Sequence, residues 1–201
     1  IENYYRHNST PLVFGDFGVS ETTRAWIDRE NPFADVIPVT SQGVSGWFLK
    51  PRAMMECPFD EVCWLDNDCE VLGDLSGVFE HVQPDRLAMV QDIPWTRSRG
   101  QKWHNTGVVA FCGRPPILQE WMEVTEETSA RGDQEVLHEL LQDPTRRTSL
   151  VADLPNRFNF LRLQLPLGQE LPDKLVMHWT GVDGKAHIRA TARFQESLAG
   201  R

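Results

Sequence analysis

Short apolar segments alternate with helix-like segments along most of the chain, and this alternation limits the folds that it can adopt. The sequences LVFGDF at 12–17, EVCWL at 61–65 and GVVAF at 107–111 are typical of strands. By contrast, segments 117–127 and 132–141 carry apolar residues at helical spacing. Such an order predicts an α/β protein with a sheet flanked by helices.

The same patterns predict further elements. We expect strands at 36–39, 86–91 and 175–179, helices at 20–29, 46–55 and 74–80, and the end of a helix at 1–8. Segments 94–103 and 161–173 contain prolines and are expected to be loops, the first either a mobile lid or an ordinary surface loop. Because a strand normally precedes the first helix of such a domain, we also expect a first strand with its loop, about 10 to 20 residues, ahead of residue 1.

Composition narrows the choice of partners. Hydrophobic residues make up 40% of the 201 residues, enough for the core of a single domain over residues 1–201. The 20 Lys and Arg against 29 Asp and Glu give a net charge of -9, which disfavours nucleic acid and anionic membranes as partners. A phosphorylated ligand remains possible if a divalent cation supplies positive charge.

The cysteines indicate the compartment. Residues 57, 63, 69 and 112 form neither a CxxC pair nor a Cys/His zinc spacing, and we interpret them as buried free thiols of a reducing environment. The sequence contains no signal peptide pattern and no apolar run close to 18 residues. We therefore expect a cytoplasmic protein without a transmembrane segment.

Two aspartates follow the apolar strand at 61–65. Asp66 and Asp68 are separated by one residue, so in an extended chain both carboxylates face the same side, about 6.5 to 7 Å apart at the backbone. Two such charges repel each other unless a cation lies between them, and Mg²⁺ or Mn²⁺ favours carboxylate ligands together with substrate phosphates. The alternative is an ordinary solvated turn.

Three other stretches carry groups that suit a metal and diphosphate site. His178 follows a predicted strand and offers an imidazole ligand, Gly181 permits close approach of the backbone to phosphate, and Lys185 can neutralise it. Asn105, Thr106 and Gly107 precede another strand with amide and hydroxyl groups. Asp133 and Gln134 begin a helix, either as partners of a sugar hydroxyl or, for Asp133, as a helix cap.

The order of these motifs resembles a known family. LDNDCEVLGDLSGVF, HNTGVVAFCG, GDQEVL, LPNRFNF and VMHWTG with a downstream lysine are similar to the metal-dependent retaining glycosyltransferases of GT-A fold, the glycogenin and lipopolysaccharide galactosyltransferase group. The similarity runs from residue 1 to Lys185, and LDNDCEVLGDL is its most specific part. It implies a Rossmann-like mixed sheet flanked by helices. The last motif departs from the family pattern, since Lys185 lies four residues after Gly181 in place of the usual three.

By position, the resemblance implies three groups of site residues. The expected metal ligands are Asp66, Asp68 and His178, the expected donor-binding residues are Lys50, Asn105, Gly181 and Lys185, and the expected catalytic residues are Asp133 and Gln134. The implied cofactor is Mn²⁺ or Mg²⁺, and the implied donor is a UDP-hexose or related nucleotide sugar.

The predicted function is metal-dependent transfer of a hexose from a nucleotide diphosphate sugar to a hydroxyl acceptor with retention of configuration. Double displacement with Asp133 or Gln134 as nucleophile and a same-face dissociative route both remain open. The alternatives are a nucleotidyltransferase, although the glycine-rich or basic phosphate motif expected near its N-terminus is not visible, and a non-catalytic module that binds a nucleotide sugar or metal.

Overall fold

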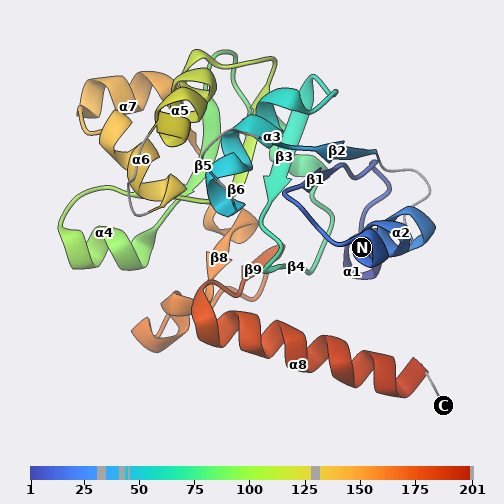
Figure 1. Ribbon diagram of the computed structural model, residues 1–201. Helices are drawn as coiled ribbons and strands as arrows, with labels where there is room; N and C mark the ends of the chain where they lie inside the picture. The colour runs from blue at the N-terminus through green and yellow to red at the C-terminus, as the bar shows by residue number, and fades with distance from the viewer. Residues whose placement is uncertain (31–34, 41–43, 45, 128–131, 200–201) are drawn as a thin grey trace.

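The computed structural model describes residues 1–30, 35–40, 44, 46–127 and 132–199. A sheet of four strands lies at its centre (Figure 1). Its strands lie in the order β3 (Glu61–Leu65), β6 (His104–Cys112), β5 (Leu87–Gln91) and β7 (Val151–Asp153). Strands β3 and β5 run antiparallel to β6, whereas β5 and β7 are parallel. The sheet is therefore mixed, as the resemblance implied.

Two smaller sheets complete the strand arrangement. Strands β1 (Phe14–Asp16) and β2 (Val36–Pro38) form a parallel pair. Strand β9 (Val176–His178) lies between β4 (Cys69–Val71), to which it is antiparallel, and β8 (Phe160–Leu161), to which it is parallel. The second sheet brings the segment after β3 beside the C-terminal part of the chain.

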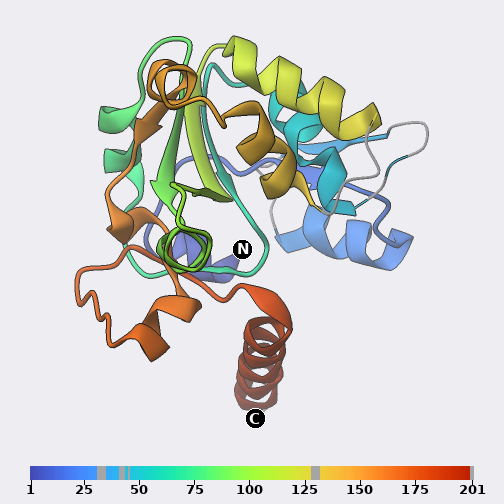
Figure 2. The same ribbon diagram turned by 90° about the vertical axis from the view of Figure 1, so that its left-hand side faces the viewer.

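Helices surround the sheets (Figures 1 and 2). The α-helices are α1 (Glu2–Tyr5), α2 (Glu21–Glu30), α3 (Lys50–Glu56), α4 (Ile93–Arg99), α5 (Pro116–Glu127), α6 (Asp133–Leu140), α7 (Pro144–Leu150) and α8 (Gly181–Ala199), and the 3-10 helices are η1 (Gly46–Leu49), η2 (Ser76–His81), η3 (Asn156–Phe158) and η4 (Arg162–Leu167). Helix α8 extends away from the central sheet in both views. None of the described helices has the length and apolar character needed to cross a membrane.

Alternate residues of the central strands build cores on the two faces of the sheet. On one face, Leu87, Met89 and Val109 pack with side chains of α3, α5 and α6, including the fully buried Trp121. On the other face, Ala88, Val90, Val108 and Ala110 pack with η2, η3 and β9. Because both faces are covered, the polar groups that follow the strands gather at the sheet ends.

The structure confirms most of the predicted elements and corrects two. The segment at 94–103 contains helix α4, which begins after Asp92 and ends at Gly100. The Asp92 carboxylate accepts a hydrogen bond from the backbone N–H of Trp95, and Gly100 adopts a left-handed conformation (φ 68°), so both helix ends are capped. The segment at 161–173, expected to be a loop, contains the 3-10 helix η4. Helices α7 and α8 and strands β7 and β8 were not expected from the sequence.

A large cleft lies beside the sheets. It has a volume of 1580 Å³ and is lined by residues of β1 and β3 and by the polar side chains described below. In the described part of the chain, β1 pairs with β2 and β3 pairs with β6, so each contributes a strand edge to this cleft.

Candidate active site

Pairing of β4 with β9 forms the centre of the candidate site. The chain turns after β3 through Asp66 and Asp68 and enters β4 at Cys69, which lies opposite His178 in the β4–β9 register. The Asp68 carboxylate is consequently 3.1 Å from the His178 imidazole (Oδ1 to Nε2), and the backbone N–H of Trp179 donates to the Asp68 carbonyl at 2.9 Å. Asp68 and His178 are both buried, with 7% and 3% of their surface exposed.

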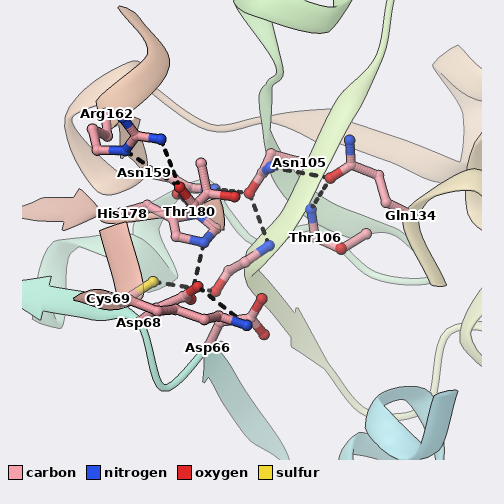
Figure 3. Close-up of polar contacts among 12 residues, drawn as sticks. Asp66, Asp68, Cys69, Asn105, Thr106, Gln134, Asn159, Arg162, His178 and Thr180 are labelled. Atoms are coloured by element: carbon pink, nitrogen blue, oxygen red, sulfur yellow. Dashed lines mark hydrogen bonds and ion pairs between the residues drawn. The ribbon is translucent and has the colours of Figure 1, made fainter. Parts of the chain in front are cut away.

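A chain of side-chain amides orients the His178 ring (Figure 3). Asn159 donates through Nδ2 to Asn105 Oδ1 at 2.8 Å, so its own Oδ1, 3.0 Å from His178 Nδ1, accepts a hydrogen bond from the ring N–H. With the proton on Nδ1, the Nε2 lone pair of a neutral ring faces the Asp68 carboxylate. The carboxylate oxygen and the ring nitrogen both present lone pairs at this distance, so a cation between them, either a proton or a metal ion, stabilises the contact.

Gly107 makes room for this ring. A Cβ atom at Gly107 would lie 2.1 Å from His178 Cε1 and 2.5 Å from Nδ1, far inside van der Waals contact. The Gly107 N–H also donates to Asn105 Oδ1 at 2.9 Å. The position therefore requires glycine for steric reasons.

Lys50 contacts two of the acidic residues of the site. Its ammonium group is buried, 3.0 Å from Asp66 Oδ1 and 2.9 Å from Asp133 Oδ2, and it also donates to the Thr106 carbonyl at 3.2 Å. Burial alone would lower the pKa of Lys50, but Asp66 and Asp133 outweigh it and raise the pKa above its ordinary value. The lysine thus stays charged and compensates two carboxylates, one of which also accepts a 2.7 Å hydrogen bond from the Trp64 indole.

Asp133 and Gln134, at the start of α6, enter the same network. Asp133 accepts a 2.8 Å hydrogen bond from the Thr106 hydroxyl, and the N-cap of α6 is Gly132, so Asp133 serves as an ion-pair partner and not as the helix cap. Gln134 Oε1 accepts from Asn105 Nδ2 at 3.0 Å and from the Thr106 N–H at 3.3 Å.

Lys185 reaches the site from helix α8. The helix begins at Gly181, whose positive φ of 86° turns the chain after β9. The half-exposed ammonium of Lys185 then lies 4.0 Å from Asp68 Oδ2. Burial would raise the pKa of Asp68, but the contacts with His178 and Lys185 outweigh it and the pKa is lowered. Lys185 therefore lies beside Asp68 although it follows Gly181 by four residues and not by three.

All nine predicted site residues line the same cleft. Two buried residues that sequence reasoning missed hold some of these side chains in place. Asp92 accepts from Asn105 Nδ2 and Gln134 Nε2, both at 3.1 Å, and Asn159 orients His178. A polar residue at the end of a strand was the available signal for Asp92, and the asparagine within NRFNF was the signal for Asn159.

The residues that could hold a metal differ in part from the predicted set. Among the described residues, one ligand atom each from Asp68, Cys69 and His178 lie within 4.8 Å of one another, and Asp66 is not a member of this group. The donor set of carboxylate and imidazole suits a divalent cation. The metal-binding roles of Asp66, Asp68 and His178 stay predictions.

Comparison with known proteins identifies the fold. No protein-family model and no curated protein matches the sequence. Among solved structures, the galactosyltransferase LgtC in complex with donor and acceptor sugar analogues is 16% identical, with a TM-score of 0.62 over 88% of this chain and 78% of that chain. The glycosyltransferase GlyE of Streptococcus pneumoniae TIGR4 is 24% identical, with a TM-score of 0.60 over 89% of this chain and 50% of that chain. Mouse xyloside xylosyltransferase 1 is 13% identical, with a TM-score of 0.58 and 88% coverage of both chains.

These likenesses, together with polar groups at the ends of an open mixed sheet, define an α/β fold that binds ligands at the ends of its strands. More closely, it is the GT-A fold of these glycosyltransferases, which confirms the fold implied by the sequence motifs. This chain spans about half the length of GlyE, with 50% of that chain covered.

Proposed function

We propose that this protein is a glycosyltransferase that moves a hexose from a nucleotide diphosphate sugar, with UDP as the expected nucleotide, to a hydroxyl acceptor. The observation that carries the proposal is the contact of Asp68 with His178, 3.1 Å apart, in a cleft that also holds Lys185 and Gln134. Its fold is shared with galactosyl- and xylosyltransferases. Carboxylate, imidazole and lysine groups in one cleft suit a metal-bound diphosphate.

Asp68 and His178 would hold Mn²⁺ or Mg²⁺, with Asp66 as a further ligand once it is released from Lys50. The metal would act as a Lewis acid toward the leaving diphosphate. Asn159 fixes the tautomer of His178, so the ring presents the Nε2 lone pair to the cleft. Lys185, whose side chain is half-exposed, can turn from Asp68 to a phosphate oxygen and neutralise part of its charge.

Asp133 and Gln134 would act on the sugar. Both Gln134 hydrogen bonds to Oε1 come from N–H donors of Asn105 and Thr106, which reduce the electron density available for nucleophilic attack. Asp133 is paired with Lys50 in the same way. These partners favour the same-face route over double displacement, with the two side chains placed to stabilise positive charge at the sugar.

Hydrolysis of a panel of nucleotide sugars by the full-length protein tests the proposal. Release of nucleotide diphosphate is measured with Mn²⁺, with Mg²⁺ and with a chelator. We expect metal-dependent release with at least one donor, and an Asp68→Asn variant should lose about 100-fold or more of the rate. Asp173→Asn, which changes an exposed aspartate of the loop before β9, is the matched control.

Other outcomes would decide against the proposal. Release of pyrophosphate from a nucleoside triphosphate would indicate a nucleotidyltransferase. Metal-dependent binding of UDP without turnover of any donor or acceptor would indicate a binding module. Equal rates for Asp68→Asn and Asp173→Asn would remove the acid–imidazole pair from the mechanism.

A further inference from the structure

Trp103 and His138 form an aromatic contact beside the candidate site. Trp103 lies just before β6, and His138 lies in the last turn of α6. Their rings are stacked, with centroids 3.5 Å apart and an angle of 9° between the planes. Both residues are buried. The stack therefore joins α6 to the chain that enters β6.

This stack lies next to the contact that fixes Gln134. Gln134 and His138 are four residues apart on one face of α6. Trp103 continues the pairing of β5 with β6, since its carbonyl accepts from the Asp92 N–H at 2.8 Å, and Asn105 follows it by two residues on the same side of the strand. Asn105 Nδ2 donates to Gln134 Oε1 at 3.0 Å (Figure 3). Helix α6 thus contacts β6 through two adjacent side-chain pairs.

Helix α4 contacts the same stack. The Trp95 ring packs edge to face against Trp103, with centroids 4.8 Å apart, and the Arg99 guanidinium lies over both rings at 5.2 and 5.8 Å. Asp92, which caps α4, accepts from Gln134 Nε2 at 3.1 Å. Because α4 bears on the stack and its cap binds Gln134, a displaced stack would also disturb the second partner of the amide.

We propose that Trp103 and His138 are positioning residues for Gln134. Their stack holds α6 against the start of β6 and thereby keeps the Gln134 amide at a fixed place in the cleft. This inference rests on the proposed function, in which Gln134 acts on the sugar. It adds two residues that do not touch the substrate but determine where one of its partners lies.

The His138 ring acts by its shape and not by its charge. Burial, and then the charges of Arg147, His104 and Arg99, lower the pKa of His138 to about 4, so the ring is neutral at pH 7. Its one side-chain hydrogen bond, between Nε2 and Gln101 Oε1 at 3.2 Å, is to an exposed residue. Another flat ring should therefore replace it.

Steady-state kinetics of donor hydrolysis with Mn²⁺ test the proposal in the full-length protein. His138→Gln and His138→Leu both remove the ring, whereas His138→Phe keeps a flat one. We expect the first two to lower kcat by about 10- to 100-fold, since a displacement of about 1 Å in a site costs that much, and His138→Phe to recover most of the loss. The KM for the donor should change by less than about threefold, because the contacts of Asp68 and His178 are untouched.

Ile117→Ala is the control for lost stability. It shortens a buried side chain of α5 in the same core and should leave kcat unaltered at temperatures where the variant is folded. A loss of kcat as large as that of the ring-free variants would assign their effect to stability and overturn the proposal. A kcat unchanged in both ring-free variants, or a loss that His138→Phe does not recover, would also overturn it.

Nuclear magnetic resonance of the Gln134 side-chain amide gives a measurement that needs no donor. The signal is assigned from its disappearance in Gln134→Glu. We expect it to shift and to exchange faster with water in His138→Leu, and to stay near its original position in His138→Phe. An amide signal that follows the ring while no donor is turned over refutes the proposed function alone. Donor turnover with an amide signal indifferent to the ring refutes this inference alone.

Discussion

Replacement of Gly107 by alanine tests how closely the His178 ring is held. The new methyl group would meet Cε1 at 2.1 Å and Nδ1 at 2.5 Å. The imidazole ring cannot move away freely, because its Nδ1 is hydrogen-bonded to Asn159 and its Nε2 contacts Asp68. Either the β6 backbone or the imidazole must move.

The expected cost follows from these contacts. Overpacking of a filled interior costs about 1–3 kcal/mol, and loss of a hydrogen bond to a charged group costs about 1.5–3 kcal/mol. The ring needs to lose only one of its two polar contacts, that with Asn159 or that with Asp68. We therefore expect Gly107→Ala to lower the free energy of unfolding by about 2–4 kcal/mol. For a chain of this size, that corresponds to a fall in Tm of about 5 to 15 °C.

Urea unfolding and calorimetric titration with Mn²⁺ measure the two consequences. A displaced imidazole should weaken metal binding by about 10- to 100-fold. Gly77→Ala is the matched control, because its Cβ would meet only Phe158 Cζ at 4.0 Å, an ordinary contact. If Gly107→Ala matches this control in both stability and metal affinity, the packing of His178 against the strand is not as described.

Two further predictions concern charged groups. Lys50→Met should lower the free energy of unfolding in urea by about 3–5 kcal/mol, since it leaves Asp66 and Asp133 without their shared cation, and the added change Asp133→Asn should recover part of the loss. Burial, and then the charge of Arg147, lowers the pKa of His138 from 6.5 to about 4, so the unfolded chain binds the proton first as the pH falls. The free energy of unfolding should therefore drop between pH 6.5 and 4 by about 1–2 kcal/mol after allowance for solvent screening. In melts recorded over this pH range, His138→Gln should remove that part of the drop. A pH profile that this substitution leaves unaltered would contradict the assignment to His138.

Three of the four central strands, β3, β5 and β6, could be predicted because each contains a run of apolar residues, whereas the short strand β7 was missed. The expected strand at 61–65 matches β3 (Glu61–Leu65) because its apolar run stops at a charged residue. Helix α4 was missed because Pro94 and Gly100 were interpreted as loop residues, whereas they lie in its first turn and at its C-cap. Helix α7 carries the same signal, since Asp143 caps it and Pro144 opens it. Residues that end one element can equally begin another, and the sequence pattern alone does not distinguish these roles.

The site residues also divide into those that the sequence pattern identified and those that it missed. Asp66, Asp68 and His178 could be selected because the two aspartates follow strand β3 and the histidine is the last residue of strand β9. Asp92 and Asn159 could not, since they act by bonds to side chains from distant segments. Cys69 was interpreted as a buried free thiol, and the structure places it free and partly buried opposite His178, a position that depends on the β4–β9 register, which no local pattern encodes.

The β4–β9 pairing also sets an order of events during synthesis. Glu70 and Trp179, which are hydrogen-bonded at 2.8 Å, stand 109 residues apart in the chain. Strands β3, β5 and β6 all end by Cys112, so a ribosome can release these three strands of the central sheet before His178 has been made. Contacts of such long range form slowly, and a nascent or truncated polypeptide can thus form these three strands while it still lacks the histidine that contacts Asp68.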